Sequence, residues 1–348
     1  LLAARRGLIR VRTFKEMGYN SPLEKITDQQ ADKIAEFLKE KDPEKDYHVR
    51  VVYEFREPLV PEVLTEIAKD PPDELVLLPL YMAESDFTNG ISRTDLATFH
   101  RSHGNNPLPR PAYVNGFGFD ERVGETMAEF VWEYCRRHGW DEEKTRDAAL
   151  IMGAHGTLQY PPEGINSGAR ETLHLFGMIR KHLKDKFRTV RIGWLNHTLG
   201  GKWTFPAVDE TAKECQDQNI RSVVYFPFGF MADNNESMNE GRLALDEFEW
   251  EDLLYLPCPN DDDAFCGLLA DMTIERLQQP EREDWDAIES GGRRDLVQRP
   301  RGATRGKDGL LKFNGPALGM LSVFFWFLGG AILIVRGSVF AAEIESPD

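Results

Sequence analysis

Short apolar runs alternate with amphipathic stretches along most of the chain. Six consecutive small or apolar residues at 148–153 are typical of a strand that is buried on both faces of a parallel sheet, and 75–80 and 222–227 have the same character. Between such runs, apolar positions recur at helical spacing, as in 31–38 and 121–137. This alternation of strands and helices predicts an α/β fold with parallel sheets.

The pattern predicts two similar halves, residues 1–145 and 146–280. Strands are expected at 47–55, 75–81, 148–153, 189–195, 222–227 and 253–256. Helices are expected at 27–41, 60–68, 94–100, 121–137, 169–183, 209–218, 235–245 and 265–277. The two halves share this rhythm without a tight sequence repeat.

The C-terminal part has a different character. Residues 281–314 are charged, rich in Gly and Arg and without apolar periodicity, which predicts a linker. Residues 315–336 contain an uncharged stretch, Pro316 to Val335, which can cross a hydrocarbon core of roughly 30 Å as a helix. We therefore expect a transmembrane helix followed by a tail at 337–348; a buried core helix is the alternative.

Charges beside this stretch predict its orientation. Arg336 alone follows it, whereas several basic residues precede it: Arg293, Arg294, Arg299, Arg301, Arg305, Lys307 and Lys312. By the positive-inside rule, the part of the chain that precedes the stretch is expected on the cytoplasmic side of a membrane.

Charge and cysteine content exclude several classes of function. A net charge of −16 argues against a nucleic-acid partner but suits a cation ligand. The four cysteines lack the Cys-x-x-Cys spacing of zinc and iron–sulfur motifs, so no iron–sulfur cluster is expected.

His155 is the first candidate for chemistry. It stands where the strand at 148–153 delivers its C-terminal end, and Gly156 beside it lets the backbone turn. Ligands of open α/β sheets bind outside the carboxyl ends of the strands, so His155 lies where a site is expected. A hydrogen-bonded loop histidine is the alternative. The polar loop at 82–92 follows another buried strand and is expected on the same ligand side.

Three carboxylates follow the strand at 222–227. Asp233, Glu236 and Glu240 have spacings that place them on one face of a helix. Carboxylates so close repel one another unless a cation or proton lies among them, which favours cation handling. A solvated acidic helix start, stabilised by the helix dipole, is the alternative. Trp203 is a weaker candidate, since core packing is the commoner role of tryptophan.

Several segments, taken in order, resemble the ferrochelatase family over residues 5–278. The matching segments are Ser21-Pro22-Leu23 with Thr27 and Gln30-Ala31, Leu78-Pro79-Leu80-Tyr81 with Ser85, Thr88 and Gly90, Ala154-His155-Gly156, Gly200 with Trp203 and Pro206, and Pro227 with Gly229-Phe230, Asp233, Glu236 and Glu240. The resemblance implies two doubly wound, Rossmann-like halves with a porphyrin cleft between them. It also implies insertion of ferrous iron into protoporphyrin or coproporphyrin in haem biosynthesis, with iron as a substrate and no cofactor consumed.

The resemblance also implies roles for single residues. His155 matches the family's active-site histidine, expected to ligate the metal or accept a proton. Glu236 and Glu240 match an acidic row that would deliver metal or relay protons. The residues expected beside the porphyrin are Ser85, Thr88, Gly90, Trp203 and Asp233.

Some features depart from the family pattern. The family opens with a strand and a Gly-Gly-Pro loop that have no counterpart before Ser21, so the first half is expected to lack its first strand. Glu54 stands where the family usually has arginine, and 164–167 replace Gly-Asp-Pro-Tyr. Two alternatives therefore stay open: a related chelatase for another metal or tetrapyrrole, and a ferrochelatase-like protein that binds a tetrapyrrole without turnover.

Overall fold

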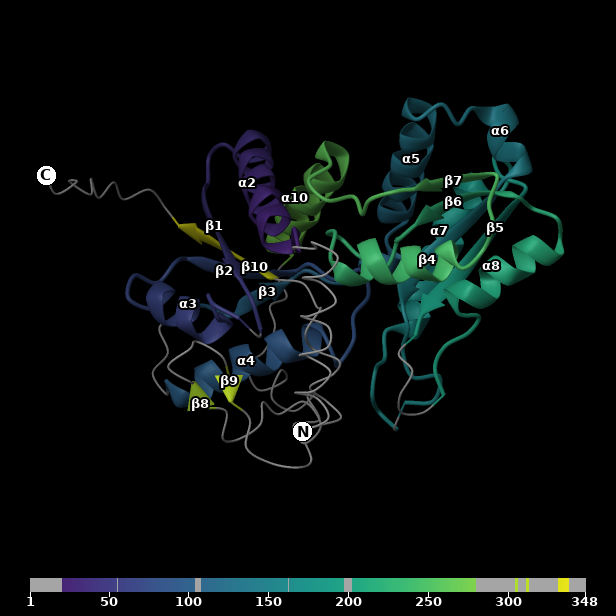
Figure 1. Ribbon diagram of the computed structural model, residues 1–348. Helices are drawn as coiled ribbons and strands as arrows, with labels where there is room; N and C mark the ends of the chain where they lie inside the picture. Colours follow the sequence, from purple (N-terminus) through teal and green to yellow (C-terminus); the bar gives the residue numbers. More distant parts are fainter. Residues whose placement is uncertain are drawn as a thin grey trace, which may run out of the picture.

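The computed structural model describes residues 21–54, 56–103, 108–161, 163–196 and 202–279, together with the backbone of three short strands at 304–305, 311–312 and 331–337. Two four-stranded sheets lie beside each other in this part of the chain, and each has helices on both faces (Figure 1). The predicted α/β fold is confirmed in both halves; the second sheet is all parallel as expected, whereas the first contains one antiparallel strand, β10.

The second sheet has the strand order β5-β4-β6-β7, and all its strands are parallel. Its strands are β4 (Ala149–His155), β5 (Thr189–Leu195), β6 (Ser222–Phe226) and β7 (Asp252–Tyr255). Leu150 and Met152 of β4 belong to the core shared with α5 and α7, whereas Ala149 and Ile151 pack on the side of α8. Both faces of β4 are thus covered, which explains its unbroken apolar sequence.

The helices around the second sheet are α5 (Glu121–Arg137), α6 (Glu142–Asp147), α7 (Ala169–Leu183), α8 (Val208–Asp217) and α9 (Gly241–Asp246). The short helix α6 was not predicted, because its six residues are too polar to show periodicity. Its start is fixed locally by Asp141, whose side chain accepts a hydrogen bond from the backbone N–H of Lys144.

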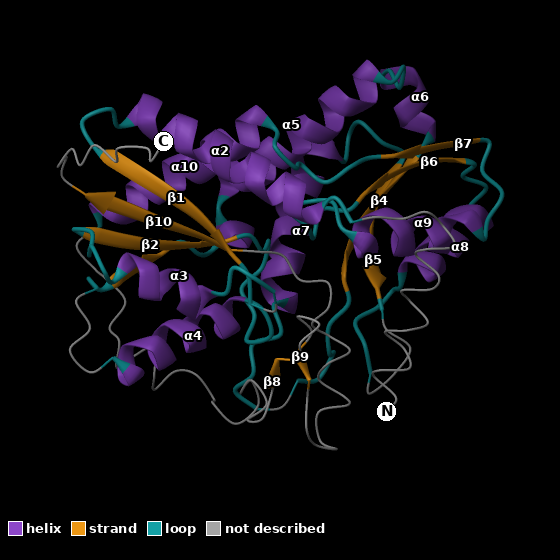
Figure 2. Ribbon diagram, turned by 60° about the vertical axis from the view of Figure 1, so that its left-hand side comes forward, coloured by secondary structure: helices purple, strands orange, loops and turns teal. Residues whose placement is uncertain are grey.

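The first sheet has the order β1-β10-β2-β3. Its strands are β1 (Asp46–Val52), β2 (Glu74–Pro79), β3 (Pro111–Tyr113) and β10 (Ala331–Gly337). Figure 2 shows one pair of helices on each face of this sheet. One pair is α2 (Leu23–Lys41) and α10 (Asp263–Gln278), and the other is α3 (Val60–Ile67) and α4 (Asn89–Ser102). Helix α4 begins five residues before the predicted 94–100.

One apolar core joins the two sheets. It contains residues of α2, α5, α7 and α10 as well as the inner faces of β2 and β4, for example Leu38, Val76, Val131, Met152 and Leu269, all fully buried. Helix α10 comes from the second half of the sequence but packs against α2 of the first. Residues 146–280 therefore do not all stay with the second sheet, and the two halves are fixed to one another by this shared core.

Strand β10 occupies the central place of the first sheet. It pairs antiparallel with β1 on one side, from Val52↔Ala331 to Asp46↔Gly337, and with β2 on the other. In the second sheet, the second position in the strand order is held by β4, which is the first strand of that half in sequence and is parallel to both neighbours. In the first sheet the same position is held by β10, which comes from the C-terminal part of the chain. Residues 1–20 lie outside the described part.

The transmembrane helix expected at 315–336 is not confirmed. For residues 331–336 the prediction is wrong, because this stretch, rich in β-branched residues, pairs with two neighbouring strands as part of β10. Residues 316–330 lie outside the described part. Among the described residues no helix is long and apolar enough to cross a membrane.

Two further strands, β8 (Thr304–Arg305) and β9 (Leu311–Lys312), form a small antiparallel pair within the predicted linker. The rest of the linker and the tail at 338–348 lie outside the described residues.

Candidate active site

His155 is the last residue of β4, at the carboxyl edge of the second sheet. The strand behind it is fully buried, while the His155 side chain is 26% exposed, so the ring lies at the border between core and solvent. Gly156 turns the chain away: its backbone N–H donates to the Leu195 carbonyl at 2.8 Å, and a Cβ at this position would run into the Asn196 side chain. His155 is therefore held where the sequence predicted it.

A close approach of two loops brings a second group to His155. Gly229, which follows β6, packs so tightly on β4 that a Cβ would lie 2.8 Å from Ala154 Cα, and its N–H donates to the Gly153 carbonyl at 3.1 Å. The chain after Gly229 is thereby placed over the end of β4. In consequence His155 Nδ1 and Glu236 Oε1 lie 2.6 Å apart.

Glu236 is the first residue of η2 (Glu236–Glu240), a π-helical turn. Such turns are rare and occur frequently at functional sites. Asn234 fixes the start of the turn, because its Oδ1 accepts hydrogen bonds from the backbone N–H groups of Glu236 at 2.8 Å and Ser237 at 3.1 Å. The sequence predicted an ordinary α-helix here. The i→i+5 hydrogen bonds of a π-helical turn do not produce a recognisable pattern of apolar positions over so few residues.

The Glu236 carboxyl group is buried, with 1% of its side chain exposed. Oε1 is bound to His155, whereas Oε2 has no hydrogen-bond partner among the described residues. An unsatisfied buried carboxylate oxygen is costly unless a proton or a cation satisfies it. The arrangement is thus suited to receive a positive charge, either on His155 or at Glu236.

The pKa of His155 reflects two opposing effects. Burial lowers the pKa of the imidazole, but the charge of Glu236, its hydrogen bond to His155 and the charge of Glu240 raise the pKa more, so the net shift is upward. When Nδ1 carries the hydrogen that faces Glu236, Nε2 bears the ring's lone pair. His155 can therefore act as a base or as a metal ligand through Nε2, with Glu236 holding the tautomer.

The other two carboxylates of the predicted acidic row have different neighbours. Asp233 accepts hydrogen bonds from the backbone N–H of Cys258 at 2.9 Å and from Asn260 Nδ2 at 2.8 Å, so it fastens the loop at 258–260. Glu240 Oε1 accepts from Asn235 Nδ2 at 3.3 Å. Of the three carboxylates, Glu236 is hydrogen-bonded to His155. The described residues contain no group of three or more His, Cys, Asp or Glu side chains placed to hold a metal ion.

Ser85 and Thr88 lie between β2 and α4, at the carboxyl edge of the first sheet, and Gly90 is the second residue of α4. The Ser85 carbonyl accepts from the N–H groups of Thr88 at 3.1 Å and Gly90 at 3.0 Å, which builds the turn itself. Trp203 belongs to the second half, where a β-bridge pairs it with Leu158 in the loop after His155. The porphyrin contacts expected for these residues remain predictions.

Glu54 follows β1 and is almost fully buried, at 3% exposed. Its carboxylate accepts hydrogen bonds from Tyr81 Oη at 2.8 Å and from Ser92 Oγ. Burial, followed by the charge of Glu54, places the pKa of Tyr81 well above its usual range. In the sequence, Glu54 stood out only because the family usually has arginine at this position. The two hydroxyl groups that donate to Glu54 come from other parts of the chain, so local sequence patterns could not predict these contacts.

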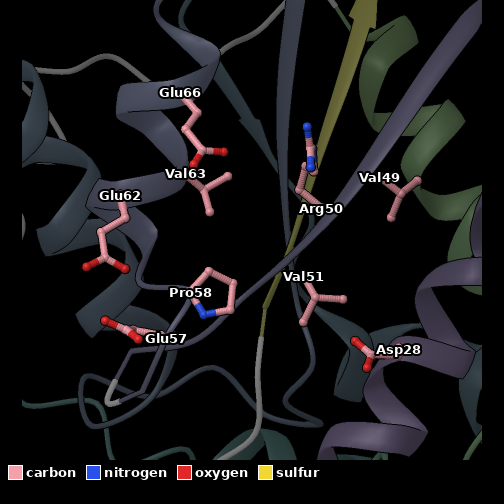
Figure 3. A pocket seen from close by; sticks show the side chains of 9 residues that line it. All are labelled: Asp28, Val49, Arg50, Val51, Glu57, Pro58, Glu62, Val63 and Glu66. Atoms are coloured by element: carbon pink, nitrogen blue, oxygen red, sulfur yellow. The ribbon is translucent and has the colours of Figure 1, made fainter. Parts of the chain in front are cut away.

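A separate open hollow of about 760 Å³ lies along the outer edge of β1 (Figure 3). It is lined by Asp28, Val49, Arg50, Val51, Glu57, Pro58, Glu62, Val63 and Glu66. The lining carries four carboxylates and one guanidinium, so it repels a ligand whose own substituents are carboxylates, such as a porphyrin. It contains neither His155 nor Glu236.

The fold and this site define a class of protein. The arrangement of the two α/β sheets is similar to the fold of SirB from Bacillus subtilis, solved with Fe3+, at a TM-score of 0.50 and 14% identity over 71% of this chain and 90% of that one. The molecule therefore has a chelatase fold. The sequence model of the ferrochelatase family matches residues 2–277, and the chain belongs to that family.

Curated relatives agree with this assignment. The mitochondrial ferrochelatase of Drosophila melanogaster is 25% identical over 287 residues, which are 77% of this chain and 70% of the relative. The ferrochelatase of Nostoc punctiforme is 22% identical over 288 residues, 80% of this chain and 71% of the relative. The protein is thus a metal chelatase, an enzyme that inserts a metal ion into a tetrapyrrole.

Proposed function

We propose that the protein inserts ferrous iron into a porphyrin, either protoporphyrin or coproporphyrin, in haem biosynthesis. The observation that carries the proposal is the pair formed by His155 and the buried Glu236 at the carboxyl end of β4. Membership of the ferrochelatase family supports iron as the metal and a porphyrin as its acceptor.

The reaction replaces two porphyrin protons by one ferrous ion, and the His155–Glu236 pair can assist the removal of the protons. Two pyrrole N–H protons leave the porphyrin and one ferrous dication enters, so the ring remains neutral. We assign His155 Nε2 as the acceptor of the first proton and solvent water as the acceptor of the second. Glu236 then faces an imidazolium rather than a neutral ring, and its buried carboxylate stabilises that cation.

Glu236 and Glu240 are assigned to metal delivery or to onward proton transfer. Glu236 Oε2 has no hydrogen-bond partner in the described part of the chain. The Glu236 carboxylate can therefore accept a proton from His155 or contact the incoming metal ion. Glu240 lies at the other end of the same π-helical turn and is half-buried, so it is nearer to solvent. No resident cofactor enters this scheme.

Ser85, Thr88, Gly90 and Trp203 are assigned to the porphyrin side of the site. The first three lie at the carboxyl edge of the first sheet, and Trp203 is paired with the loop that follows His155. Asp233, by contrast, supports the site through its hydrogen bonds to the loop at 258–260.

The test is anaerobic incubation of the full chain with ferrous iron and detergent-dispersed protoporphyrin, followed as loss of porphyrin fluorescence. Turnover with iron supports the proposal, and competition with cobalt distinguishes it from a chelatase for another metal. Binding of the porphyrin without metal insertion would instead support a non-catalytic tetrapyrrole-binding protein.

Anchorage in a membrane, with the catalytic part on the cytoplasmic side, is a second part of the proposal. It rests on the uncharged stretch at 316–335 and on the basic residues before it. A helix through residue 335 and strand β10 exclude each other, because both need residues 331–335. An anchored form would therefore be one in which β10 has left the first sheet.

A further inference from the structure

Two loops from different halves meet beside the site. The first follows β2 and carries Ser85 at its turn; the second follows His155 and ends at Gly168, the N-cap of α7. Asp86 of the first loop and Asn166 of the second form two hydrogen bonds: Asp86 N–H donates to the Asn166 carbonyl at 2.9 Å, and Asn166 N–H donates to Asp86 Oδ2 at 2.8 Å.

The Asn166 side chain fixes the second loop and reaches the first. Its Oδ1 accepts from Gly168 N–H at 3.0 Å, and its Nδ2 donates to the Glu84 carbonyl at 2.9 Å. The backbones also approach closely at Gly168, which has a φ of 79° and where a Cβ would lie 3.3 Å from the Glu84 carbonyl oxygen. Both the conformation and the contact favour glycine there.

Glu171 adds a buried contact to the same region. It lies in the first turn of α7, is 5% exposed, and accepts from Glu84 N–H at 2.8 Å and Gly118 N–H at 2.9 Å. Glu84 is thus held through its backbone N–H by Glu171 and through its carbonyl by Asn166. The residue before Ser85 is fixed from two sides by the other half of the molecule.

The second loop is in turn tied to the strand end that carries His155. Thr157 Oγ1 donates to the Ser167 carbonyl at 3.0 Å, one residue from Asn166. Thr157 itself is two residues from His155, and its carbonyl accepts from Thr204 N–H at 2.9 Å. A short series of hydrogen bonds therefore connects the turn of Ser85 to the backbone next to His155.

We propose that Asp86 and Asn166 are positioning residues which hold the Ser85 turn at a fixed place relative to His155, and that this clasp sets the affinity for the porphyrin rather than the rate of metal insertion. The inference rests on the proposed function, because it takes the two loops as opposite borders of the porphyrin site. Neither residue is assigned a contact with the porphyrin or the metal.

Four variants test the clasp. Asp86→Ala removes the Oδ2 acceptor of Asn166 N–H. Asn166→Ala removes the Nδ2 donor to Glu84 and the Oδ1 acceptor of Gly168 N–H, but keeps the two hydrogen bonds that the Asn166 backbone makes with Asp86, so the two changes remove different contacts. The third variant combines them. Asp86→Asn is the matched control, since its side-chain oxygen can still accept from Asn166 N–H.

Porphyrin affinity is measured by quenching of tryptophan fluorescence with metal-free protoporphyrin, and kcat and KM are measured with ferrous iron. Each alanine variant is expected to bind porphyrin about threefold to tenfold more weakly, as for the loss of one net hydrogen bond. The double variant is expected to bind more weakly still, with kcat near the wild-type value and with Asp86→Asn close to wild type. Wild-type porphyrin affinity in the double variant, or a fall in kcat with unchanged affinity, would overturn the inference.

Amide hydrogen exchange separates this inference from the proposed function. Loss of the clasp is expected to increase exchange at residues 84–88 and 164–168 in the double variant, with the second sheet unchanged. A wild-type protein that binds porphyrin but inserts no iron would refute the proposed function, while the affinities and exchange rates would still decide the role of the clasp. Unchanged exchange in both loops would show that the clasp does not order them, and the inference would fail.

Discussion

His155 and Glu236 share a hydrogen bond of 2.6 Å between Nδ1 and Oε1, although 81 residues separate them in sequence. The contact depends on the close packing of Gly229 against Ala154, which directs the chain after β6 across the end of β4. The proposed base thus stands at the end of β4, and the carboxylate that faces it stands in η2, the turn that follows the neighbouring strand β6. This is the relationship on which the proposed chemistry depends.

Replacement of His155 by alanine is expected to abolish metal insertion while porphyrin binding survives. The imidazole is the proposed proton acceptor or metal ligand, and loss of such a group costs about 100-fold or more in rate. Turnover and porphyrin quenching are measured on the same preparation. A variant that keeps more than about a tenth of the wild-type rate would remove His155 from the centre of the mechanism.

The pH dependence of turnover reports on the His155–Glu236 pair. The pKa of His155 is raised in the folded protein, and the neutral imidazole is the proposed active form, so kcat/KM should increase as the pH rises through that raised pKa. The stabilising effect of the pair has the opposite sense: it is fully present below the unfolded-state pKa of about 6.5 and is lost as the pH rises through the folded-state pKa.

Glu236→Gln separates these effects. Without the carboxylate charge, burial is left as the larger influence and lowers the pKa of His155, so the acidic limb of the pH profile should move to lower pH while kcat falls. Glu240→Gln should shift the limb in the same direction but less, because the charge of Glu240 raises the pKa of His155 less than Glu236 does. Identical pH profiles and metal-dependence curves in all three proteins would show that the carboxylates are only a polar helix start.

The position of His155 could be predicted because the end of a buried apolar run is visible in the sequence, and the carboxyl edge of a parallel sheet is a general ligand site. Its partner could not be selected from Asp233, Glu236 and Glu240, since α-helical spacing gave all three the same standing. The π-helical turn and the hydrogen bonds of Asp233 to the loop at 258–260 distinguish them, and both depend on tertiary contacts.

The same limit explains the first sheet. The run at 331–335 is apolar enough for a membrane helix and β-branched enough for a central strand, and local sequence does not separate these outcomes. The strand is favoured because β1 and β2 both offer unpaired edges to residues 331–337, and this depends on the assembled sheet rather than on local sequence.

The hydrogen bonds between Asp86 and Asn166 could not be predicted for a related reason, because the sequence around each residue is that of an ordinary loop.

The approach of Gly229 to β4 predicts a stability effect that needs no ligand. Gly229→Ala places a methyl group 2.8 Å from Ala154 Cα, so one backbone must move, at a cost of about 1–3 kcal/mol. Gly177→Ala is the control, because no atom lies within 4 Å of the added methyl group and the site is in the middle of α7. That control should be neutral or stabilised by roughly 0.5–1 kcal/mol.

Both variants are compared by urea denaturation, with turnover measured in parallel. Gly229→Ala should also lose activity, since the displaced loop carries Glu236. Equal stability of Gly229→Ala and wild type would mean that the packing of this loop on β4 is looser than the structure has it.

Strand β10 leads to a prediction about the tail that opposes simple membrane anchorage. A central strand donates and accepts hydrogen bonds on both edges, and proline cannot donate. Leu333→Pro therefore should destabilise the folded protein by about 3 kcal/mol, comparable to a helix-breaking proline, and lower Tm by roughly 6 °C or more.

A chain ending at Gln279 extends the test, because it removes β10 while keeping all the described helices that pack on the two sheets. With β10 as the central strand, the shortened chain exposes the facing edges of β1 and β2 and should melt at lower temperature or aggregate. If the tail instead serves only as an anchor, this chain should be folded, monodisperse and active on detergent-dispersed porphyrin, and Leu333→Pro should then weaken membrane association without changing Tm. Measuring Tm and membrane partition for the same three proteins decides which role residues 331–337 have.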